Sequence, residues 1–193
     1  MYYYRELTLL PDVEVTENFL WSKLFYEVHH ALAEGRKRHP AMNIGCSWPE
    51  YKDEGLGKKL RLIAESRADL ESLPLEHHLA RYDDYCHLTS IRPVGDRRIQ
   101  GYALYRRYQP DGASDRKARR YVRRHPELSF EEARRLLKQK EKKFLPFIQM
   151  ESESTGQKFS LFIEKIKGQE APHGEAASFS TYGLSASAAV PEF

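Results

Sequence analysis

The chain is poor in cysteine and lacks any long apolar run. Cys46 and Cys86 are the only cysteines in 193 residues, and they lie far apart, outside any CxxC spacing. This excludes a disulfide framework and gives no sign of a structural zinc site, so both are expected to be small buried side chains. No apolar stretch reaches the roughly 18 residues that span a bilayer, and the N-terminus lacks a signal-peptide pattern. We therefore expect a cytoplasmic protein with no membrane partner.

Negative charge is scarce in one segment of the chain. The formal net charge is only +3, but residues 101–143 carry 14 Lys and Arg against 6 Asp and Glu. Within this segment, residues 116–124 read RKARRYVRR, and no acidic residue follows before Glu127. On a helix the six basic residues share an arc of about 160°, opposite Ala118, Tyr121 and Val122. A one-sided basic face without i,i+4 carboxylates favours a phosphate backbone as its partner over an ordinary solvated surface.

Hydrophobic periodicity in the first half predicts an α+β fold. Strands are expected at Tyr2–Leu9, Asn43–Trp48, Lys59–Ala64 and Cys86–Val94. Helices are expected over Thr16–Ala33, with Gly35 just beyond the end, and from Ser66 towards Tyr82, with a break at Pro74. The order βαββαβ is the ferredoxin-like arrangement of RNA-recognition modules. The aromatic signature of those modules is absent from the predicted strands, so RNA binding has to come from another part of the chain.

The second half predicts a strand, two helices and a small antiparallel sheet. The expected elements are a strand at Gly101–Gln109, the arginine-rich helix at about 114–125, a helix at Phe130–Lys143, and strands at Phe147–Ser152 and Lys158–Lys167. Ser114 or Asp115 should cap the arginine-rich helix, His125-Pro126 should end it, and Ser129 with Glu132 should form a capping box. A stretch at Phe179–Leu184 and a weakly patterned tail follow. We expect residues 1–95 to form the ferredoxin-like domain and residues 96–193 an RNA-binding region.

Two cleavage chemistries fit a nucleic-acid partner. A metal-dependent nuclease needs clustered carboxylates, and the basic region offers only Glu131 and Glu132, which a helix N-terminus explains, so no metal or cofactor is expected. The alternative uses the 2′-hydroxyl of RNA as nucleophile and needs a base such as histidine. Taken alone, His29 is better explained as a boundary histidine packed at a helix edge than as a catalyst. Ser152 and Ser154 share one strand face, and alternation is expected to turn Glu151 and Glu153 away from them.

Four strings occur together in an informative order. They are LFYEVHHAL, the arginine-rich helix ending in RRH, PFIQMESESTGQKFSLFI and the terminal FSTYGLS. With them the chain resembles the subtype I-F CRISPR repeat-processing endoribonucleases. The resemblance runs from the first strand to the last residues, is most specific at STGQ-x-F and YGLS, and is weak over residues 36–100. It implies metal-independent cleavage of precursor RNA at the base of a repeat hairpin, with the product kept bound beside other subunits of a type I-F surveillance complex.

The resemblance also implies roles for individual residues. His29 would take the proton from the 2′-hydroxyl, Ser152 would position the ribose and Tyr182 would orient the histidine, leaving a 2′,3′-cyclic phosphate and a 5′-hydroxyl. RNA-binding roles fall on Arg107 and Gln109 (base reading), Arg116, Arg119, Arg120, Arg123, Arg124 and His125 (phosphates), Ser154 and Thr155 (near the scissile phosphate) and Phe159 (stacking on the terminal base pair). Two alternatives remain, a non-catalytic subunit that holds an RNA hairpin and a basic DNA-binding protein.

Overall fold

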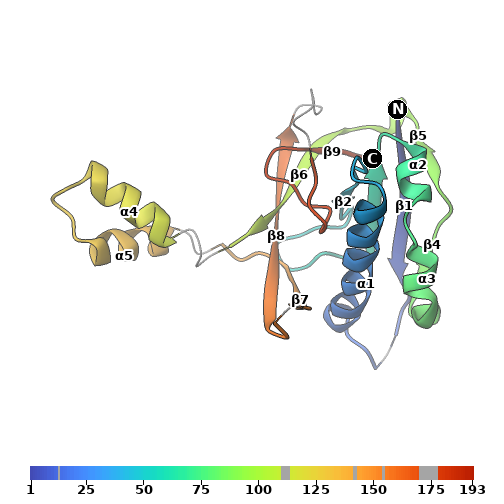
Figure 1. Ribbon diagram of the computed structural model, residues 1–193, viewed down its shortest axis with the longest axis horizontal. Helices are drawn as coiled ribbons and strands as arrows, with labels where there is room; N and C mark the ends of the chain where they lie inside the picture. The colour runs from blue at the N-terminus through green and yellow to red at the C-terminus, as the bar shows by residue number, and fades with distance from the viewer. Residues whose placement is uncertain (13, 110–113, 141–142, 154, 170–177) are drawn as a thin grey trace.

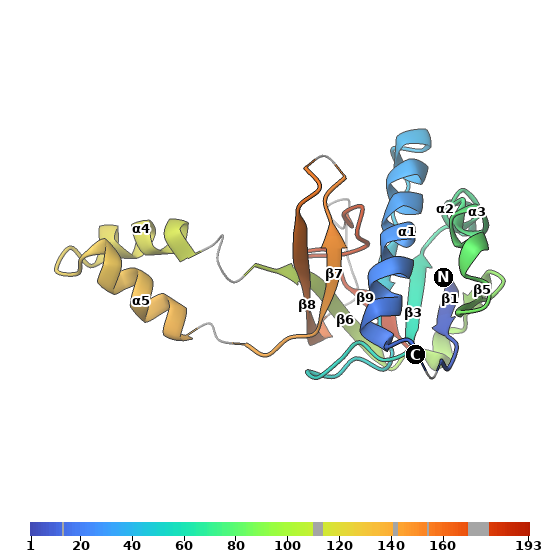
Figure 2. The same cartoon turned by 90° about the horizontal axis from the view of Figure 1, so that it is seen from below.

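Helix α1 (Glu17–Arg38) lies between two antiparallel sheets, and a pair of helices, α4 and α5, stands away from them (Figures 1 and 2). The computed structural model describes the chain except residues 13, 110–113, 141–142, 154 and 170–177, and it describes 114, 116, 138–140 and 169 without their side chains. Within these residues the fold is α+β, as the sequence predicts.

The first sheet has the order β2-β3-β1-β4, with β5 also paired to β1, which is the predicted ferredoxin-like arrangement. Its strands are β1 (Tyr2–Leu9), β2 (Gly45–Ser47), β3 (Lys59–Ala64), β4 (Cys86–Leu88) and β5 (Arg92–Val94). The expected single strand Cys86–Val94 is divided, because Leu88 lies opposite Leu7 while Arg92 lies opposite Tyr4. The chain advances four residues from Leu88 to Arg92, while β1 advances three between their partners. The extra residue forms a β-bulge that separates β4 from β5.

Helix α1 extends five residues past the predicted end at Ala33. Thr16 caps its start, with the side-chain oxygen accepting a hydrogen bond from the Phe19 amide at 3.4 Å. Gly35 was expected just outside the helix but lies within it, at a position where a Cβ atom would come within 3.0 Å of both Leu73 and Met42. The glycine thus permits close packing, and it does not terminate the helix.

The second helical stretch is broken at Pro74, as predicted. It consists of α2 (Arg67–Glu71), α3 (Leu75–Leu79) and a 3-10 turn at Ala80–Tyr82, and a further 3-10 turn lies at Asp96–Arg98. None of the helices in the described ranges is long and apolar enough to cross a membrane.

The second sheet has the order β7-β8-β6-β9. Its strands are β6 (Gly101–Tyr108), β7 (Phe147–Glu151), β8 (Lys158–Gln169) and β9 (Val190–Glu192). One hydrophobic core joins it to the first sheet: the Trp48 ring lies 5.6 Å from both the Phe25 and the Tyr105 ring. The Tyr105 hydroxyl also donates a hydrogen bond to the Trp48 carbonyl at 3.1 Å. Residues 1–95 and 96–193 therefore share a core.

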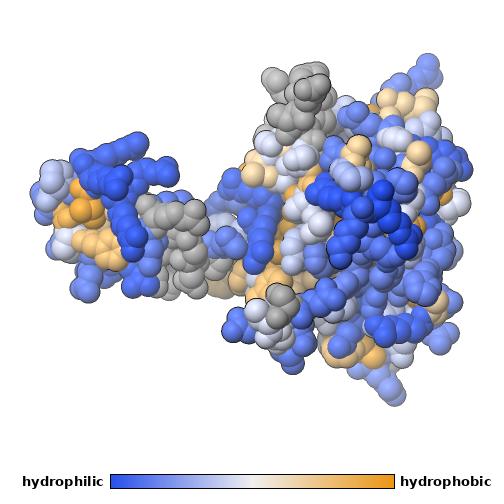
Figure 3. All heavy atoms as spheres, in the orientation of Figure 1, coloured by the Kyte–Doolittle hydropathy of each residue, from blue (hydrophilic) through white to orange (hydrophobic). Residues whose placement is uncertain are grey.

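The pair of helices α4 (Ser114–Arg124) and α5 (Phe130–Lys140), here called the arm, projects from the second sheet (Figures 1 and 2). Ala118 and Ala133 are buried, and Asp115 pairs with Arg134 at 3.0 Å. The predicted capping box is present, because the Glu132 amide donates to Ser129 Oγ at 3.2 Å and the Ser129 amide to Glu132 Oε2 at 2.9 Å. Figure 3 shows hydrophilic residues over most of the arm.

Candidate functional site

His29 lies half-buried on α1, with its ring held by a distant part of the chain. Nδ1 is 2.9 Å from the carbonyl oxygen of Thr181. Because a carbonyl can only accept a hydrogen bond, Nδ1 carries the hydrogen, and in the neutral ring Nε2 then keeps its lone pair. This is the tautomer in which Nε2 can accept a proton.

The structure brings Tyr182 directly against His29. The two rings are stacked, with centroids 4.0 Å apart and an angle of 4° between their planes. Tyr182 follows the residue whose carbonyl binds Nδ1, so two consecutive residues constrain the imidazole, one at its edge and one at its face. The pair fixes both the tautomer and the orientation of the ring.

The surroundings of His29 favour its neutral form. Burial is the largest effect and lowers the pKa of His29, and the charge of His30 lowers it further. The hydrogen bond to Thr181 and the carboxylate of Glu153 act in the opposite direction but do not reverse the shift. At neutral pH the histidine is therefore available as a base.

The segment that carries Thr181 and Tyr182 is anchored to helix α1 and strand β2. Arg36 Nη2 donates to the Phe179 carbonyl at 2.6 Å, and the Cys46 amide donates to the Gly183 carbonyl at 2.8 Å. Gly183 has φ of +65°, and a Cβ atom there would lie 2.3 Å from Cys46 Sγ. Only glycine fits at this position.

Sequence reasoning assigned no role in this site to Arg36, Cys46 or Gly183, and predicted only that Cys46 is buried, which is confirmed. The glycine stands in the YGLS string, so it could have been found as a backbone requirement of that motif. Arg36 lies among other basic residues at the end of α1, and nothing in its local sequence distinguishes it.

Ser152 lies one residue beyond the end of β7, whereas the sequence predicted it as the last residue of that strand. Its amide donates to the Gln157 carbonyl at 2.9 Å, and the Gly156 amide donates to the Ser152 carbonyl at 2.7 Å, which closes a tight turn. Because the strand has already ended, its alternation does not govern Glu153. The carboxylate of Glu153 instead lies near enough to influence the pKa of His29.

Thr155 is a further predicted residue of this turn. Thr155 is exposed, and its hydroxyl accepts a hydrogen bond from the Gln157 amide at 3.4 Å. Ser154 lies outside the described residues.

Arg107 and Phe159 come together on neighbouring strands of the second sheet. The Arg107 guanidinium carbon lies 5.2 Å from the centre of the Phe159 ring, a cation–π contact. Arg107 is exposed near the end of β6, Gln109 follows it just after the strand and is also exposed, and Phe159 is half-buried on β8. The structure therefore presents a cation, an amide and an aromatic ring on one end of the sheet.

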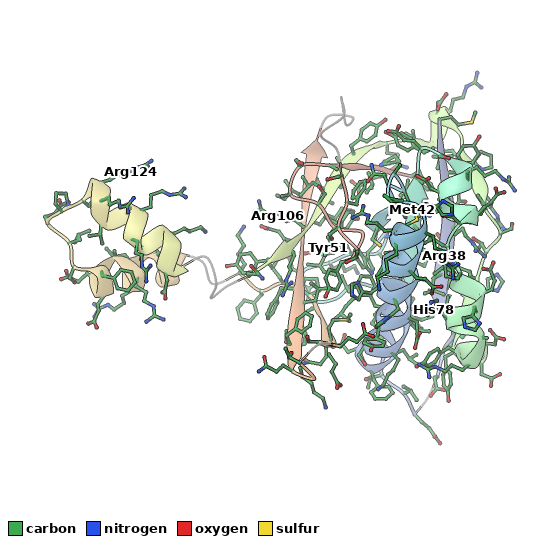
Figure 4. The ribbon with its side chains drawn as sticks, in the orientation of Figure 1. Arg38, Met42, Tyr51, His78, Arg106 and Arg124 are labelled. Carbon is green, nitrogen blue, oxygen red and sulfur yellow. The ribbon has the colours of Figure 1, made fainter. Side chains whose placement is uncertain are left out.

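The four arginines 119, 120, 123 and 124 are exposed on α4, opposite the buried Ala118. Figure 4 shows Arg124 on the arm, well away from α1. His125 is half-buried after the helix end; its ring stacks on Tyr121 with centroids 4.3 Å apart, and Nδ1 lies 3.2 Å from Glu127 Oε1. The side chain of Arg116 lies outside the described residues. The basic face and the His29 site are thus on separate parts of the molecule.

Potential metal ligands do not gather in the described ranges. There, no group of three or more His, Cys, Asp or Glu side chains is placed to hold an ion. Cys46 and Cys86 are free and buried, and burial raises the pKa of the Cys86 thiol to about 11.

Comparison with known proteins extends over almost the whole chain. The family model for the CRISPR-associated protein Cas_Csy4 matches residues 4–193, which include every predicted site residue. A CRISPR-associated endonuclease Cas6/Csy4 of Escherichia coli (strain UTI89 / UPEC) is 33% identical over 202 residues, covering 100% of both chains. A CRISPR-associated endonuclease Cas6/Csy4 of Pseudomonas aeruginosa (strain UCBPP-PA14) is 36% identical over 198 residues, again covering 100% of both.

Proposed function

The chain belongs to the Csy4 family of CRISPR-associated proteins and is a CRISPR RNA-processing endonuclease, and from the geometry at His29 we propose that it cuts by activating the 2′-hydroxyl of its substrate. The substrate is CRISPR precursor RNA, cut at the base of the repeat hairpin. The observation that carries this mechanism is the hydrogen bond from His29 Nδ1 to the Thr181 carbonyl at 2.9 Å. It leaves Nε2 free to act as the base.

The proposed reaction needs no metal ion. His29 Nε2 takes the proton of the 2′-hydroxyl, and that oxygen forms a bond to the adjacent phosphorus. The bond from phosphorus to the 5′ oxygen breaks, the 5′ oxygen takes a proton from solvent, and His29 returns its proton to solvent. The products are a 2′,3′-cyclic phosphate upstream and a 5′-hydroxyl downstream. Ser152 positions the ribose, and Tyr182 holds the imidazole plane.

Recognition of the hairpin would use the other two groups of residues. Arg107 is suited to a guanine edge and Gln109 to an adenine edge, and Phe159 offers a ring to the terminal base pair. The arginines of α4 and His125 would bind phosphates, with Ser154 and Thr155 near the scissile one. An A-form major groove is too narrow for side chains along its length, so α4 would enter where the duplex ends.

After cutting, the protein would stay on the 3′ hairpin of the product within a type I-F surveillance complex. The cytoplasmic location expected from the sequence stays a prediction. Copurification of the protein with a discrete hairpin RNA and with other complex subunits would support this retention, whereas rapid release of the cut hairpin would contradict it.

The test is end-group analysis of the RNA that copurifies with the protein, followed by cleavage of that RNA in EDTA. We expect one hairpin ending in a cyclic phosphate and undiminished cutting. His29→Ala should slow cutting at least about 100-fold while changing hairpin affinity by less than about threefold, because a base at the scissile bond need not supply ground-state binding. His87→Ala, on the exposed side of β4, is the matched control and should cut normally.

Three results would redirect the assignment. Loss of cutting in EDTA would overturn the metal-independent mechanism. Tight binding of an RNA that is never cut would favour the non-catalytic hairpin-binding subunit. Equal binding of a DNA duplex with the same stem would favour a general basic DNA-binding protein.

A further inference from the structure

A groove of about 610 Å³ lies between the first half of α1 and the edge strand β7. The proposed chemistry and hairpin recognition use none of its principal side chains, which are Phe19, Lys23, Tyr26, Arg81, Phe147 and Lys158. Phe19 is 54% exposed and Phe147 42% exposed, which is high for aromatic rings. In Figure 3, a hydrophobic patch is visible at the lower end of α1. Exposed aromatic rings of this kind are typical of a surface that binds a partner.

One end of the groove lies beside the catalytic residues. Phe19, Lys23, Tyr26 and His30 follow one another at spacings of three or four residues, so they form a stripe along one face of α1. The Tyr26 and His30 rings are 4.3 Å apart, and His30 directly follows His29. A strand that enters the groove from the His29 site would meet these rings in turn.

The opposite wall leads to the same place. Glu151 lines the groove, and the next residue is Ser152. Burial is the largest cause that raises the pKa of Tyr26, and the carboxylates of Glu153 and Glu151 raise it further. The turn after β7 therefore lies close to the α1 stripe. The Glu151 end of the groove thus adjoins Ser152 and Glu153, beside the proposed cleavage site.

The lining combines exposed aromatic rings with cations. Lys23 Nζ lies 5.5 Å from the centre of the Phe19 ring, and the Arg81 guanidinium lies 5.1 Å from that of Tyr82, at the same rim. Glu151 is the one carboxylate among the described lining residues, and Lys158 lies opposite it in the β7–β8 register, while Arg81 is paired with the buried Glu27. Rings that stack on bases, next to cations for the phosphates, are the combination by which proteins hold single-stranded nucleic acid.

We propose that this groove binds the single-stranded RNA that continues 3′ of the cleavage site. The inference rests on the proposed function, since an RNA cut at the base of a hairpin must pass from duplex to single strand at the scissile phosphate. The hairpin lies on the side of Arg107, Phe159 and the arm, and the α1–β7 groove leaves the site by another path. Before the cut, binding in the groove would hold the single strand beside His29. After the cut, this strand would no longer be covalently joined to the hairpin.

The experiment uses the full-length protein and the copurifying hairpin, synthesised with a 2′-deoxy residue before the cleavage position so that it stays uncut. One RNA ends at the cleavage position, and the other continues for about six unpaired nucleotides. We expect the wild-type protein to bind the longer RNA about tenfold more tightly. Phe19→Ala/Phe147→Ala should abolish this difference and leave the affinity for the shorter RNA unchanged.

Phe144→Ala is the matched control, because Phe144 is 91% exposed and lies outside the groove. It should keep the tenfold difference. Equal affinity of the wild-type protein for the two RNAs would overturn the groove proposal while leaving the proposed function intact, and it would point to a protein partner for this surface. Failure of the shorter hairpin to bind at all would overturn both.

Discussion

Arg106 on β6 and Glu164 on β8 form an ion pair, with Nε 2.7 Å from Oε2, close to the point where β6 leads into the arm (Figure 4 labels Arg106). The other oxygen of Glu164 binds Lys143 on the segment that returns from the arm. Burial tends to raise the pKa of Glu164, but the hydrogen bonds from Lys143 and Arg106 outweigh it and hold the pKa below its ordinary value. One buried carboxylate therefore ties both connections of the arm to the sheet.

Replacing this carboxylate should loosen the arm. We expect Glu164→Gln to lower the free energy of unfolding by about 2 kcal/mol, less than for a fully buried pair because both cations are half exposed. Hairpin affinity should fall severalfold, since the arm loses its fixed position. Urea unfolding and binding titration measure the two effects. Lys143→Ala, which removes one exposed partner, should cost clearly less, and an equal or greater cost would contradict the role given to Glu164.

The cleavage rate should depend on pH through His29. Its pKa is lowered, so the neutral base persists to more acidic pH than for an ordinary histidine. The logarithm of the single-turnover rate should rise with pH and level off with a midpoint below about 6.5. Tyr182→Phe keeps the stacked ring and should keep this midpoint, while Tyr182→Ala exposes His29 and should move it up towards 6.5. A wild-type midpoint above 6.5 would rule out the assigned base.

Gly183→Ala should disturb the His29 site indirectly, through the segment that carries Thr181 and Tyr182. A methyl group would meet Cys46 Sγ at 2.3 Å, and the residue would still need a φ of +65°. We expect a loss of about 1–3 kcal/mol in unfolding free energy and cutting slowed by about 10- to 100-fold, because Thr181 and Tyr182 would shift. Thermal unfolding and single-turnover cleavage test this.

Gly156→Ala separates the two causes of strain. Gly156 has a similar φ of +64°, but nothing lies within 4 Å of a Cβ atom there. Its alanine variant should lose only about 1 kcal/mol. Equal destabilisation at both positions would mean that contact with Cys46 has no part in the effect.

Arg120→Ala should weaken hairpin binding and reduce its dependence on salt. Arg120 is exposed on the basic face of α4, and each phosphate contact contributes close to one unit to the salt slope. Binding titrations over a range of salt concentrations measure this slope. Arg67→Ala, an exposed arginine on α2 paired with Glu71, should leave the slope as in the wild-type protein. An unchanged slope for Arg120→Ala would remove this residue from the phosphate contacts.

Elements with a strong local pattern could be predicted from the sequence. β1, β3 and β6 follow from alternation and β-propensity, and α1 from its apolar face, while Ser129 and Glu132 marked the start of α5. β9 could not be foreseen, because a three-residue strand containing Pro191 exists only through its pairing with β6. The division of β4 from β5 likewise depends on register with β1.

The candidate site was predictable in its residue types but not in its geometry. The resemblance pointed to His29, Ser152 and Tyr182, and their catalytic roles stay predictions. The partner of Nδ1 is a backbone carbonyl 152 residues away, and a carbonyl leaves no mark in side-chain patterns. The anchoring of Thr181 and Tyr182 through Arg36 and Gly183 depends equally on the finished fold.

The order of protein synthesis determines when the contact between His29 and Thr181 can form. The histidine leaves the ribosome among the first residues, whereas the carbonyl that fixes its tautomer is made only after the arm and the second sheet strands β6 to β8. A nascent chain would hence contain the residues proposed to bind RNA before it contains the carbonyl that orients the proposed base. A product truncated before residue 179 would retain the arginines of α4 and lack the carbonyl that fixes the imidazole.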